Sequence, residues 1–370
     1  MQAERLEALV QGIKAAGIAQ QLVTDPSSIA YLIGYEIQPG ERLLLLKVAA
    51  DGRHQLYLNQ LFPQASNLAH DLEIVTYRDG EPVISWLAQS LAPGKTGIDK
   101  VWPSHFLLDL MAARQDLQPV NAAYLVDDLR AIKSPEEQEI MREASALNDQ
   151  AILALINLVA DGLPESEMVS ELAGIYQRLG CQGFSFEPII AYGANGADPH
   201  HETNDDRPQP GDSVVIDIGS SYKGYCSDMT RTVFYGEPDE ESRRVYETVR
   251  QAQEAAIKAV RPGVTLASID RAARQVIEAA IERAKEEIGE YFTHRTGHFI
   301  GREVHEAGDV SEFNQAQAQV GQIFSIEPGI YLPGKVGVRI EDLVLVTETG
   351  CQVLNQVSKD LILVDPHLKF

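Results

Sequence analysis

The chain has 370 residues, with 31 Lys and Arg against 54 Asp and Glu, so its formal net charge is −23. This charge would be repelled by nucleic-acid phosphates and by anionic lipid headgroups, so we expect neither nucleic acid nor a membrane as a partner. The lack of a long apolar run or a signal-peptide pattern, together with three scattered cysteines, predicts a cytoplasmic protein without disulfides.

The first third of the sequence combines one helical pattern with short strand patterns. Leu6, Leu9 and Ile13 recur at helical spacing and predict a helix over residues 4–18. The strand patterns that follow are bounded by turn residues and lie at 21–24, 43–48, 56–58 and 73–77. These elements predict a mixed α/β domain with its boundary near residue 130, which gives domains of 1–130 and 131–370.

The second domain opens with a strong helix-start signal. Ser134 can cap a helix, Pro135 suits its first position, and Glu137 is the acid that a capping box requires. Apolar residues continue at helical spacing to Ala160, where residues 161–164 break the pattern. We therefore predict a long helix that starts at this signal.

The sequence then passes twice through one plan of helix, breaker, helix and acid-ended strand. The first pass leads to Asp217, and the second, whose first helix begins near Asp239, leads to Glu327. Each acid follows a glycine by six residues, Gly211 in the first pass and Gly321 in the second. Such a duplication predicts a pseudo-twofold arrangement of two halves.

Each half carries a second acid shortly after the first. Asp228 lies 11 residues after Asp217, and Glu341 lies 14 residues after Glu327, spacings that suit a hairpin with its two acids across from each other. All four acids have apolar or β-branched neighbours, and burying four carboxylates together would be prohibitive without cations. We therefore favour a metal centre over four solvent-exposed acids.

Histidines gather in two places near these acids. Three of the nine lie within twelve residues, at His294, His298 and His305, beside glycines that permit a close backbone approach. A second group, His200 and His201, follows Pro199 shortly before the first acidic strand. One neutral imidazole would complete a dinuclear site.

In their contexts, these residues resemble the five-ligand dinuclear centre of the pita-bread metallopeptidases. The matching motifs are Ile-Asp-Ile-Gly, Ser-Asp-Met-Thr-Arg, Thr-Gly-His-Phe-Ile-Gly, Ile-Glu-Pro-Gly-Ile-Tyr and Val-Arg-Ile-Glu-Asp. That superfamily contains methionine aminopeptidase, aminopeptidase P, prolidase and the metal-free creatinase. The resemblance implies an α/β creatinase-like N-terminal domain and an α+β pita-bread catalytic domain with pseudo-twofold internal duplication.

The resemblance also implies the metal ligands. Mn²⁺ is the expected metal, with Co²⁺, Fe²⁺ or Zn²⁺ as alternatives, because a carboxylate-rich set with one imidazole suits such ions. Two ions would share a hydroxide that attacks the peptide bond. The implied ligands are Asp217, Asp228, His298, Glu327 and Glu341, of which Asp228 and Glu341 would bridge the two metals.

Further roles follow from the same resemblance. Glu327 would accept the proton of the attacking water, and His305 and His200 would hydrogen-bond the peptide and the developing oxyanion. His200 is favoured over His201 because it directly follows Pro199. His294 resembles a substrate-pocket histidine, and Arg339 would pair with one of the acids, with a surface cation on a strand as its alternative.

The N-terminal domain and the complete ligand set favour the prolidase and aminopeptidase P branch, a group of metallo-exopeptidases. We therefore expect hydrolysis of Xaa-Pro bonds in dipeptides or at the N-terminus of short peptides, by a homodimer as is usual in this branch. A small-metabolite amide or amidine hydrolase and a non-catalytic binding relative stay open. Phe299 stands where the family usually has Gly, and Gly308 stands where it often has Pro. A Phe beside a metal ligand can narrow the cleft.

Overall fold

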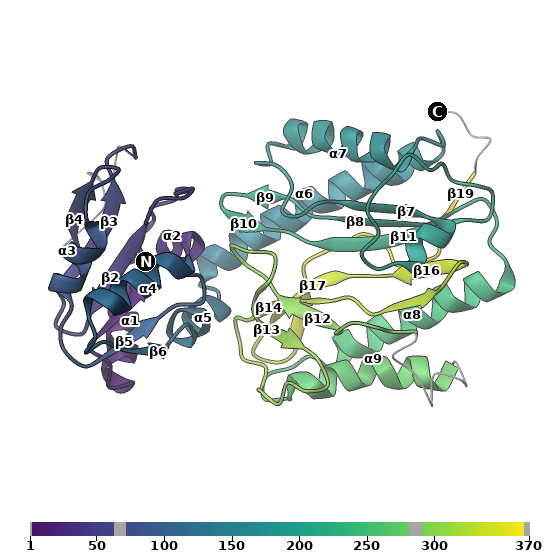
Figure 1. The fold of residues 1–370 in the computed structure, drawn as a ribbon. Helices are drawn as coiled ribbons and strands as arrows, with labels where there is room; N and C mark the ends of the chain where they lie inside the picture. Colours follow the sequence, from purple (N-terminus) through teal and green to yellow (C-terminus); the bar gives the residue numbers. More distant parts are fainter. Residues whose placement is uncertain (1, 63–71, 281–290, 366–370) are drawn as a thin grey trace. The chain divides into compact units, whose positions relative to one another are not determined.

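The computed structural model describes residues 2–62, 72–280 and 291–365. The chain separates into two compact units, residues 1–130 and residues 131–370 (Figure 1). Within the described ranges, none of the helices combines the length and the apolar character that crossing a membrane requires.

The N-terminal unit is a six-stranded sheet with helices on both faces. Its strands are, in spatial order, β4 (Leu72–Tyr77), β3 (His54–Asn59), β2 (Leu45–Ala49), β1 (Gln20–Val23), β5 (Lys95–Ile98) and β6 (Gln118–Asn121). Its helices are α1 (Gln2–Ala15), α2 (Pro26–Ile33), α3 (Val83–Ser90), α4 (Ser104–Ala113) and α5 (Tyr124–Ala131). The predicted α1 and the four predicted strands are confirmed, with ends shifted by up to two or three residues.

Strand alternation explains why helices cover both faces of this sheet. Leu22 on β1 packs into a cluster with Leu87 of α3 and Leu110 of α4. Its neighbour Val23 points the other way, into a cluster that contains Leu9 of α1. Because successive side chains leave a strand on opposite sides, apolar residues at both positions require cover on both faces.

A buried cation lies on each side of the boundary between the units. In the N-terminal unit, Arg130 Nη1 lies 3.1 Å from Asp25 Oδ2. In the C-terminal unit, Lys133 Nζ lies 3.1 Å from Glu306 Oε2. All four side chains are at most 5% exposed, so each charge depends on its partner for stabilisation.

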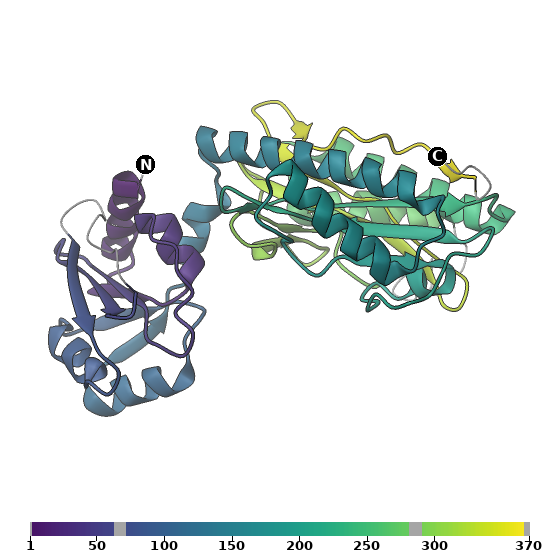
Figure 2. The ribbon, with the colours of Figure 1, turned by 90° about the horizontal axis from the view of Figure 1, so that it is seen from above.

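The first half of the C-terminal unit packs two helices on a four-stranded sheet. Its helices are α6 (Pro135–Val159) and α7 (Glu165–Leu179), and its strands are, in spatial order, β19 (Leu363–Val364), β11 (Met229–Tyr235), β8 (Ser213–Ile218) and β7 (Ile189–Tyr192). The predicted capping box is confirmed, because Ser134 accepts from the Glu137 amide while the Glu137 side chain accepts from the Ser134 amide. Figure 2 shows α6 and α7 side by side.

The second half repeats this plan with a five-stranded sheet. Its helices are α8 (Glu240–Ala259) and α9 (Leu266–Ala280), and its strands are, in spatial order, β13 (Glu306–Val310), β12 (Gly297–Phe299), β14 (Ile323–Ile326), β17 (Asp342–Val346) and β18 (Cys351–Val353). Asp239 caps α8 by accepting from the Ser242 amide. The helix pair of each half covers the outer side of its own sheet, so the two sheets lie between the helix pairs (Figure 1).

The acid-bearing strands pair as predicted, but a small ribbon is inserted where we expected a plain turn. The ribbon β9 (Ser221–Tyr222) and β10 (Tyr225–Cys226) interrupts the β8/β11 hairpin, and β15 (Gly329–Leu332) and β16 (Val336–Arg339) interrupt β14/β17. The prediction that both acids of a hairpin lie opposite each other is wrong for the first half. Asp217 pairs with Thr230, which makes Asp228 its diagonal neighbour on the same face.

Candidate metal centre

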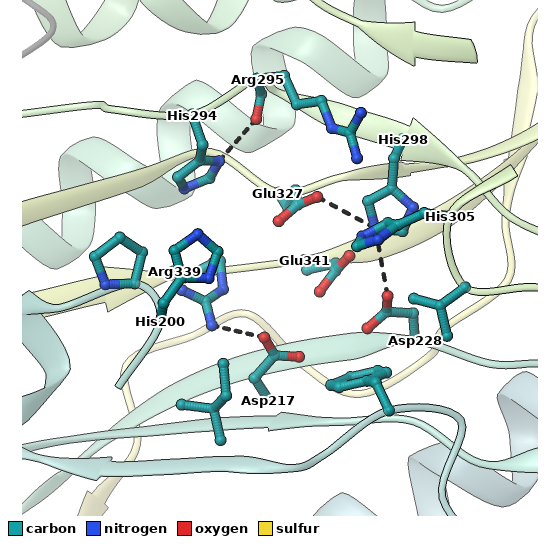
Figure 3. Close-up of a pocket in the computed structure, with 14 residues that line it drawn as sticks. His200, Asp217, Asp228, His294, Arg295, His298, His305, Glu327, Arg339 and Glu341 are labelled. Carbon is teal, nitrogen blue, oxygen red and sulfur yellow. Dashed lines mark hydrogen bonds and ion pairs between the residues drawn. The ribbon is translucent and has the colours of Figure 1, made fainter. Parts of the chain in front are cut away.

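The strand ends of the two halves converge on a cavity of about 500 Å³. In Figure 3, Asp217 and Asp228 reach into it from the teal strands, whereas His298 and Glu327 reach into it from the yellow-green strands. Every residue that the sequence analysis assigned to the site lines this cavity: His200, Asp217, Asp228, His294, His298, His305, Glu327, Arg339 and Glu341. The sequence analysis did not assign its remaining lining residues, which are Phe186, Ile189, Pro199, Arg295 and Val304.

Three of the five expected ligands form a tight group. One ligand atom each from Asp228, His298 and Glu341 lies within 4.8 Å of the others. His298 Nε2 lies 3.4 Å from Glu327 Oε1 and also 3.4 Å from Asp228 Oδ2. Asp217 lies outside this group, as expected where two ions about 3.5–4 Å apart spread their ligands over a wider space.

Unpartnered oxygen atoms test whether this set fits metal ions. Asp217 Oδ1, Asp228 Oδ1 and Glu341 Oε1 are buried, and no residue of the described ranges donates a hydrogen bond to them. Buried polar atoms nearly always have a partner, so three orphaned carboxylate oxygens in one cavity require an explanation. Divalent cations supply one, since carboxylate oxygens and one imidazole are suitable ligands for them.

The pKa values of the four carboxyl groups support the same conclusion. Burial, reinforced by the neighbouring carboxylates, raises the pKa of Asp228 and of Glu341 well above the usual range. Burial also raises the pKa of Asp217, although the Arg339 charge opposes the change. For Glu327, burial is outweighed by His298, His294 and Arg339, so its pKa is lowered. A bound cation would favour the ionised form of all four.

Arg339 connects the first half of the site to the second. Its Nη2 donates to Asp217 Oδ2 at 2.6 Å, and its Nε donates to Thr230 Oγ1 at 3.2 Å. The Thr230 hydroxyl in turn donates to Glu341 Oε2 at 2.8 Å. One guanidinium therefore orients two of the expected ligands, Asp217 directly and Glu341 through the Thr230 hydroxyl.

Tyr331 is a member of this network that the sequence analysis missed. Arg339 Nη1 donates to its hydroxyl at 2.9 Å, and His294 Nε2 lies 2.8 Å from the same oxygen. Burial raises the pKa of Tyr331 to about 12, so the phenol stays protonated at neutral pH. A signal was present in the sequence, since Tyr331 ends the Ile-Glu-Pro-Gly-Ile-Tyr motif.

The two neighbouring candidate histidines, His200 and His201, have different surroundings. His200 lines the cavity. His201 points elsewhere, and its Nε2 lies 2.7 Å from the fully buried Glu165 carboxylate. Proline before His200 was a sufficient sequence signal for choosing between them.

His305 packs against His298, with ring centroids 4.3 Å apart and the rings nearly perpendicular. Burial lowers the pKa of His305 to about 4, with further contributions from His298 and Arg295. The imidazole is therefore neutral at pH 7, and it offers one N–H donor without adding a positive charge beside the expected metals.

Phe299 does not narrow the cavity, so the expectation based on its bulk is wrong. It follows His298 on β12, and strand alternation turns its ring away from the cavity and toward Phe324 in the core. A Cβ on Gly308 would lie 2.7 Å from the Phe299 ring. The two departures from the family pattern are therefore one packing adjustment, because the absence of a side chain at residue 308 makes room for the ring.

Arg295 is the other charged residue that the sequence analysis missed. It lines the cavity, and within the described parts of the chain its guanidinium makes neither a hydrogen bond nor an ion pair. Arg339 differs, since all three of its nitrogens have partners. Arg295 is thus the cation of the cavity lining that is available to a ligand.

Family models match both units of the chain. The model of metallopeptidase family M24 matches residues 139–348, and that of the creatinase/prolidase N-terminal domain matches residues 5–132. The chain belongs to metallopeptidase family M24. The expected branch, the fold class and the expectation of a metallo-exopeptidase are confirmed.

Relatives in this family match along nearly the whole chain. An uncharacterised peptidase of Staphylococcus aureus is 34% identical, covering 91% of this chain and 94% of the relative. The structure of dipeptidase PepE from Mycobacterium ulcerans superposes with a TM-score of 0.90 at 35% identity, covering 98% of each chain. An Xaa-Pro dipeptidase from Bacillus anthracis superposes with a TM-score of 0.87 at 31% identity, covering 98% of this chain and all of the relative.

Proposed function

We propose that this M24 enzyme is an Xaa-Pro dipeptidase that uses two divalent metal ions. The observation that carries the proposal is the convergence of four acids and one imidazole in one cavity, where three carboxylate oxygens find no partner among the described residues. The similarity to a solved Xaa-Pro dipeptidase supports the choice of substrate.

Asp217, Asp228, His298, Glu327 and Glu341 would hold the two ions. Mn²⁺ is the proposed metal. Once bound, the pair would supply a water of lowered pKa and polarise the scissile carbonyl.

The chain's own residues would position the peptide and move one proton. Glu327 has a lowered pKa and is therefore ionised at pH 7, so a carboxylate oxygen can accept a proton from the attacking water. The neutral imidazole of His305 and the imidazole of His200 would donate hydrogen bonds to the carbonyl oxygen as it gains charge. His294, held by Tyr331, would border the substrate.

The cavity wall also suits a proline ring. Phe186, Ile189 and Val304 give part of the lining an apolar character. An Xaa-Pro bond has no N–H to satisfy, so its ring can rest on apolar side chains without stranding a donor. An ordinary peptide bond would bury its N–H against the same side chains.

Arg295 favours dipeptides over longer peptides. A dipeptide has a free carboxylate one residue beyond the scissile bond, and Arg295 lies three residues before His298, within about 10 Å along the chain. A guanidinium without a partner can bind a carboxylate through two parallel hydrogen bonds. In a longer peptide, a neutral amide replaces that carboxylate.

The deciding experiment is Mn²⁺-loaded hydrolysis of Ala-Pro, its C-terminal amide, Ala-Pro-Ala and Ala-Ala, with Asp217→Asn as the blank. We expect cleavage of Ala-Pro to dominate and to vanish in the blank. Efficient cleavage of Ala-Pro-Ala would replace the dipeptidase by an aminopeptidase. Failure to cleave any proline peptide, with metal bound, would leave the small-metabolite amide hydrolase.

Arg295→Met should lower kcat/KM for Ala-Pro by about tenfold to a hundredfold, because a charge-assisted hydrogen bond contributes about 1.5–3 kcal/mol. It should leave the amide substrate unchanged. Arg244→Met, which removes an exposed arginine of α8, is the matched control. An equal loss on both substrates would contradict the assignment.

We also propose, from the branch that the chain resembles, a homodimer that works in the cytoplasm. Sedimentation equilibrium would test the assembly, with a dimer expected and a monomer mass contradicting it. Fractionation of cells that express the native chain would test the location.

A further inference from the structure

The cavity residue His200 belongs to a segment with little regular structure. It follows the short 3-10 helix η2 (Gly193–Ala197) and precedes β8, and residues 198–212 contain neither helix nor strand. Within the segment, the His200 amide donates to Asp198 Oδ1 at 2.9 Å, and further hydrogen bonds join Asn204 to Asp206 and Gln209 to Asp212. None of these bonds involves the His200 ring. Other parts of the chain must therefore fix the position of the His200 ring.

Ser166 and Pro188 hold residues 203–205 of the segment, and Glu165, the first residue of α7, contacts it on both sides of His200. Its side chain is fully buried, and its two oxygens accept four hydrogen bonds. Oε1 accepts from the Tyr192 amide at 2.9 Å and from Asn195 Nδ2 at 3.0 Å. Oε2 accepts from the Asn204 amide at 3.0 Å and lies 2.7 Å from His201 Nε2.

The four donors enclose His200 in the sequence. Tyr192 and Asn195 precede it, whereas His201 and Asn204 follow it, so one carboxylate ties both sides of the loop to the start of α7. The backbone adds a further tie, because the Glu165 amide donates to the Asp206 carbonyl at 3.1 Å. A loop held on both sides of one residue has little freedom to move that residue.

The helix itself does not require this side chain. Pro164 caps α7 without a side-chain hydrogen bond, and the Glu165 carboxylate is directed to the loop and not to the helix amides. An acid in the first turn gains a modest benefit from the helix dipole. Glu167 lies in the same turn with the same benefit but is exposed. The distinguishing property of Glu165 is its contact with the loop.

We propose that Glu165 and His201 are positioning residues that hold His200 in the cavity. This inference rests on the proposed function for the role of His200. Neither Glu165 nor His201 is among the described residues that line the cavity, so each would act through the imidazole that it positions. Because neither is an expected ligand, metal binding should be unaffected by their substitution.

The test begins with Glu165→Gln, which keeps the side-chain volume but cannot accept the same four hydrogen bonds. A glutamine offers one acceptor oxygen and one NH₂ group, so two of the four donors lose their acceptor. We expect kcat to fall about tenfold with little change in KM, since small misplacement of a catalytic group costs up to about a hundredfold. Glu167→Gln is the matched control and should retain wild-type kinetics.

A double-mutant cycle shows whether the effect passes through His200. His200→Ala should lower kcat by about a hundredfold, the scale of losing one oxyanion donor. Adding Glu165→Gln to it should cause less than a twofold further loss. An additive loss would overturn the proposal. His201→Gln keeps a side-chain N–H and should retain more activity than His201→Phe, whereas equal losses would overturn the role of His201.

Hydrogen exchange supplies a readout that does not depend on activity. Glu165 Oε1 accepts from the Tyr192 amide and Oε2 from the Asn204 amide, so a glutamine leaves one of these two amides without its acceptor. That amide should exchange at least about tenfold faster in metal-free Glu165→Gln than in metal-free wild type. Unchanged exchange of both amides would overturn the proposal. If wild type cleaves no Xaa-Pro peptide, the proposed function fails, while this comparison still decides whether Glu165 restrains the loop.

Discussion

The two halves of the catalytic unit share a frame but differ in what their inserted ribbons carry. In the first half, β9/β10 turns Tyr225 away from the cavity, and its hydroxyl donates to Glu137 Oε1 at 2.6 Å. In the second half, β15/β16 brings Tyr331 and Arg339 into the network around the expected ligands. Each half contributes two acids, yet the guanidinium that orients Asp217 directly and Glu341 through Thr230 comes from the second half.

This difference separates two requirements of the site. A duplicated hairpin is sufficient to bring four carboxylates together, because it places equivalent strand ends at one cavity. The side chains that orient those carboxylates differ between the two sides, since Arg339 and Tyr331 of β15/β16 join the network around the expected ligands whereas Tyr225 of β9/β10 bonds to Glu137. The two halves are therefore equivalent in the strands that carry the expected ligands, and they differ in the side chains that orient those ligands.

The largest predicted effect comes from removing one acid of either half. Asp228→Asn and Glu341→Gln should each lower kcat/KM by well over about a hundredfold, since even the loss of an outer hydrogen-bond partner of a metal ligand costs up to that much. Mn²⁺ at a hundredfold excess over Kd stabilises a binding-competent protein by about 2.7 kcal/mol. Calorimetry should show this stabilisation in wild type and its loss in both variants. A large loss of kcat/KM and of Mn²⁺ stabilisation in only one of the two variants would show that the acids of the two halves are not equivalent.

The ribbons give the next prediction. Tyr331→Phe removes the hydroxyl that joins Arg339 to His294 and should lower kcat/KM about tenfold, on the scale of one lost outer partner. Tyr225→Phe should leave kcat/KM unchanged but reduce stability by about 1.5–3 kcal/mol, because it removes a buried bond to a carboxylate. Steady-state kinetics and urea unfolding of both variants check this contrast, and equal kinetic losses would refute it.

The acids also predict how metal-free protein responds to pH. The pKa values of Asp228 and Glu341 are raised in the folded state, so their protonation stabilises the fold below the unfolded pKa of about 4. That stabilisation is lost as pH rises through the folded pKa. With chelator present, Asp228→Asn should therefore have a higher Tm than wild type at pH 7.5, and the difference should shrink as pH falls toward 4. A difference independent of pH would contradict the raised pKa values.

The smallest effects concern the helix caps that open each half. Ser134→Ala and Asp239→Ala should each cost about 1 kcal/mol, because each removes a side-chain acceptor for orphan amides at a helix start. In a unit of this size, that corresponds to a Tm decrease of about 2–4 °C. Differential scanning calorimetry measures both, and kcat should stay unchanged. A change in kcat of either variant would show that the cap affects the active site as well as the stability of its helix.

The sequence predicted features that depend on neighbouring residues or on a repeated pattern. The capping box at Ser134 is local, and the duplication appears as equal spacings from Gly211 and Gly321 to the two acids. The five expected ligands were found through such spacings and their motif contexts. The inserted ribbons were missed because a short strand of two to four residues has too few side chains to show alternation.

Other features depend on side-chain direction, which spacing alone does not give. Phe299 was expected at the cavity because it neighbours His298 in the sequence, yet strand alternation sends the two side chains to opposite sides. The partner of His201, Glu165, lies 36 residues earlier, and no local pattern connects them. Arg295 was missed because an arginine beside a motif carries no sign of whether a partner neutralises it.

The paired cations at the boundary have a consequence for how such a chain can be assembled by evolution. Arg130 and Lys133 are each neutralised by a carboxylate of their own unit. A gene junction between them would leave neither piece with an isolated buried charge at these positions, a defect that typically costs about 3–5 kcal/mol. For these two ion pairs, a junction at Ala131 and Ile132 therefore keeps each cation with its carboxylate.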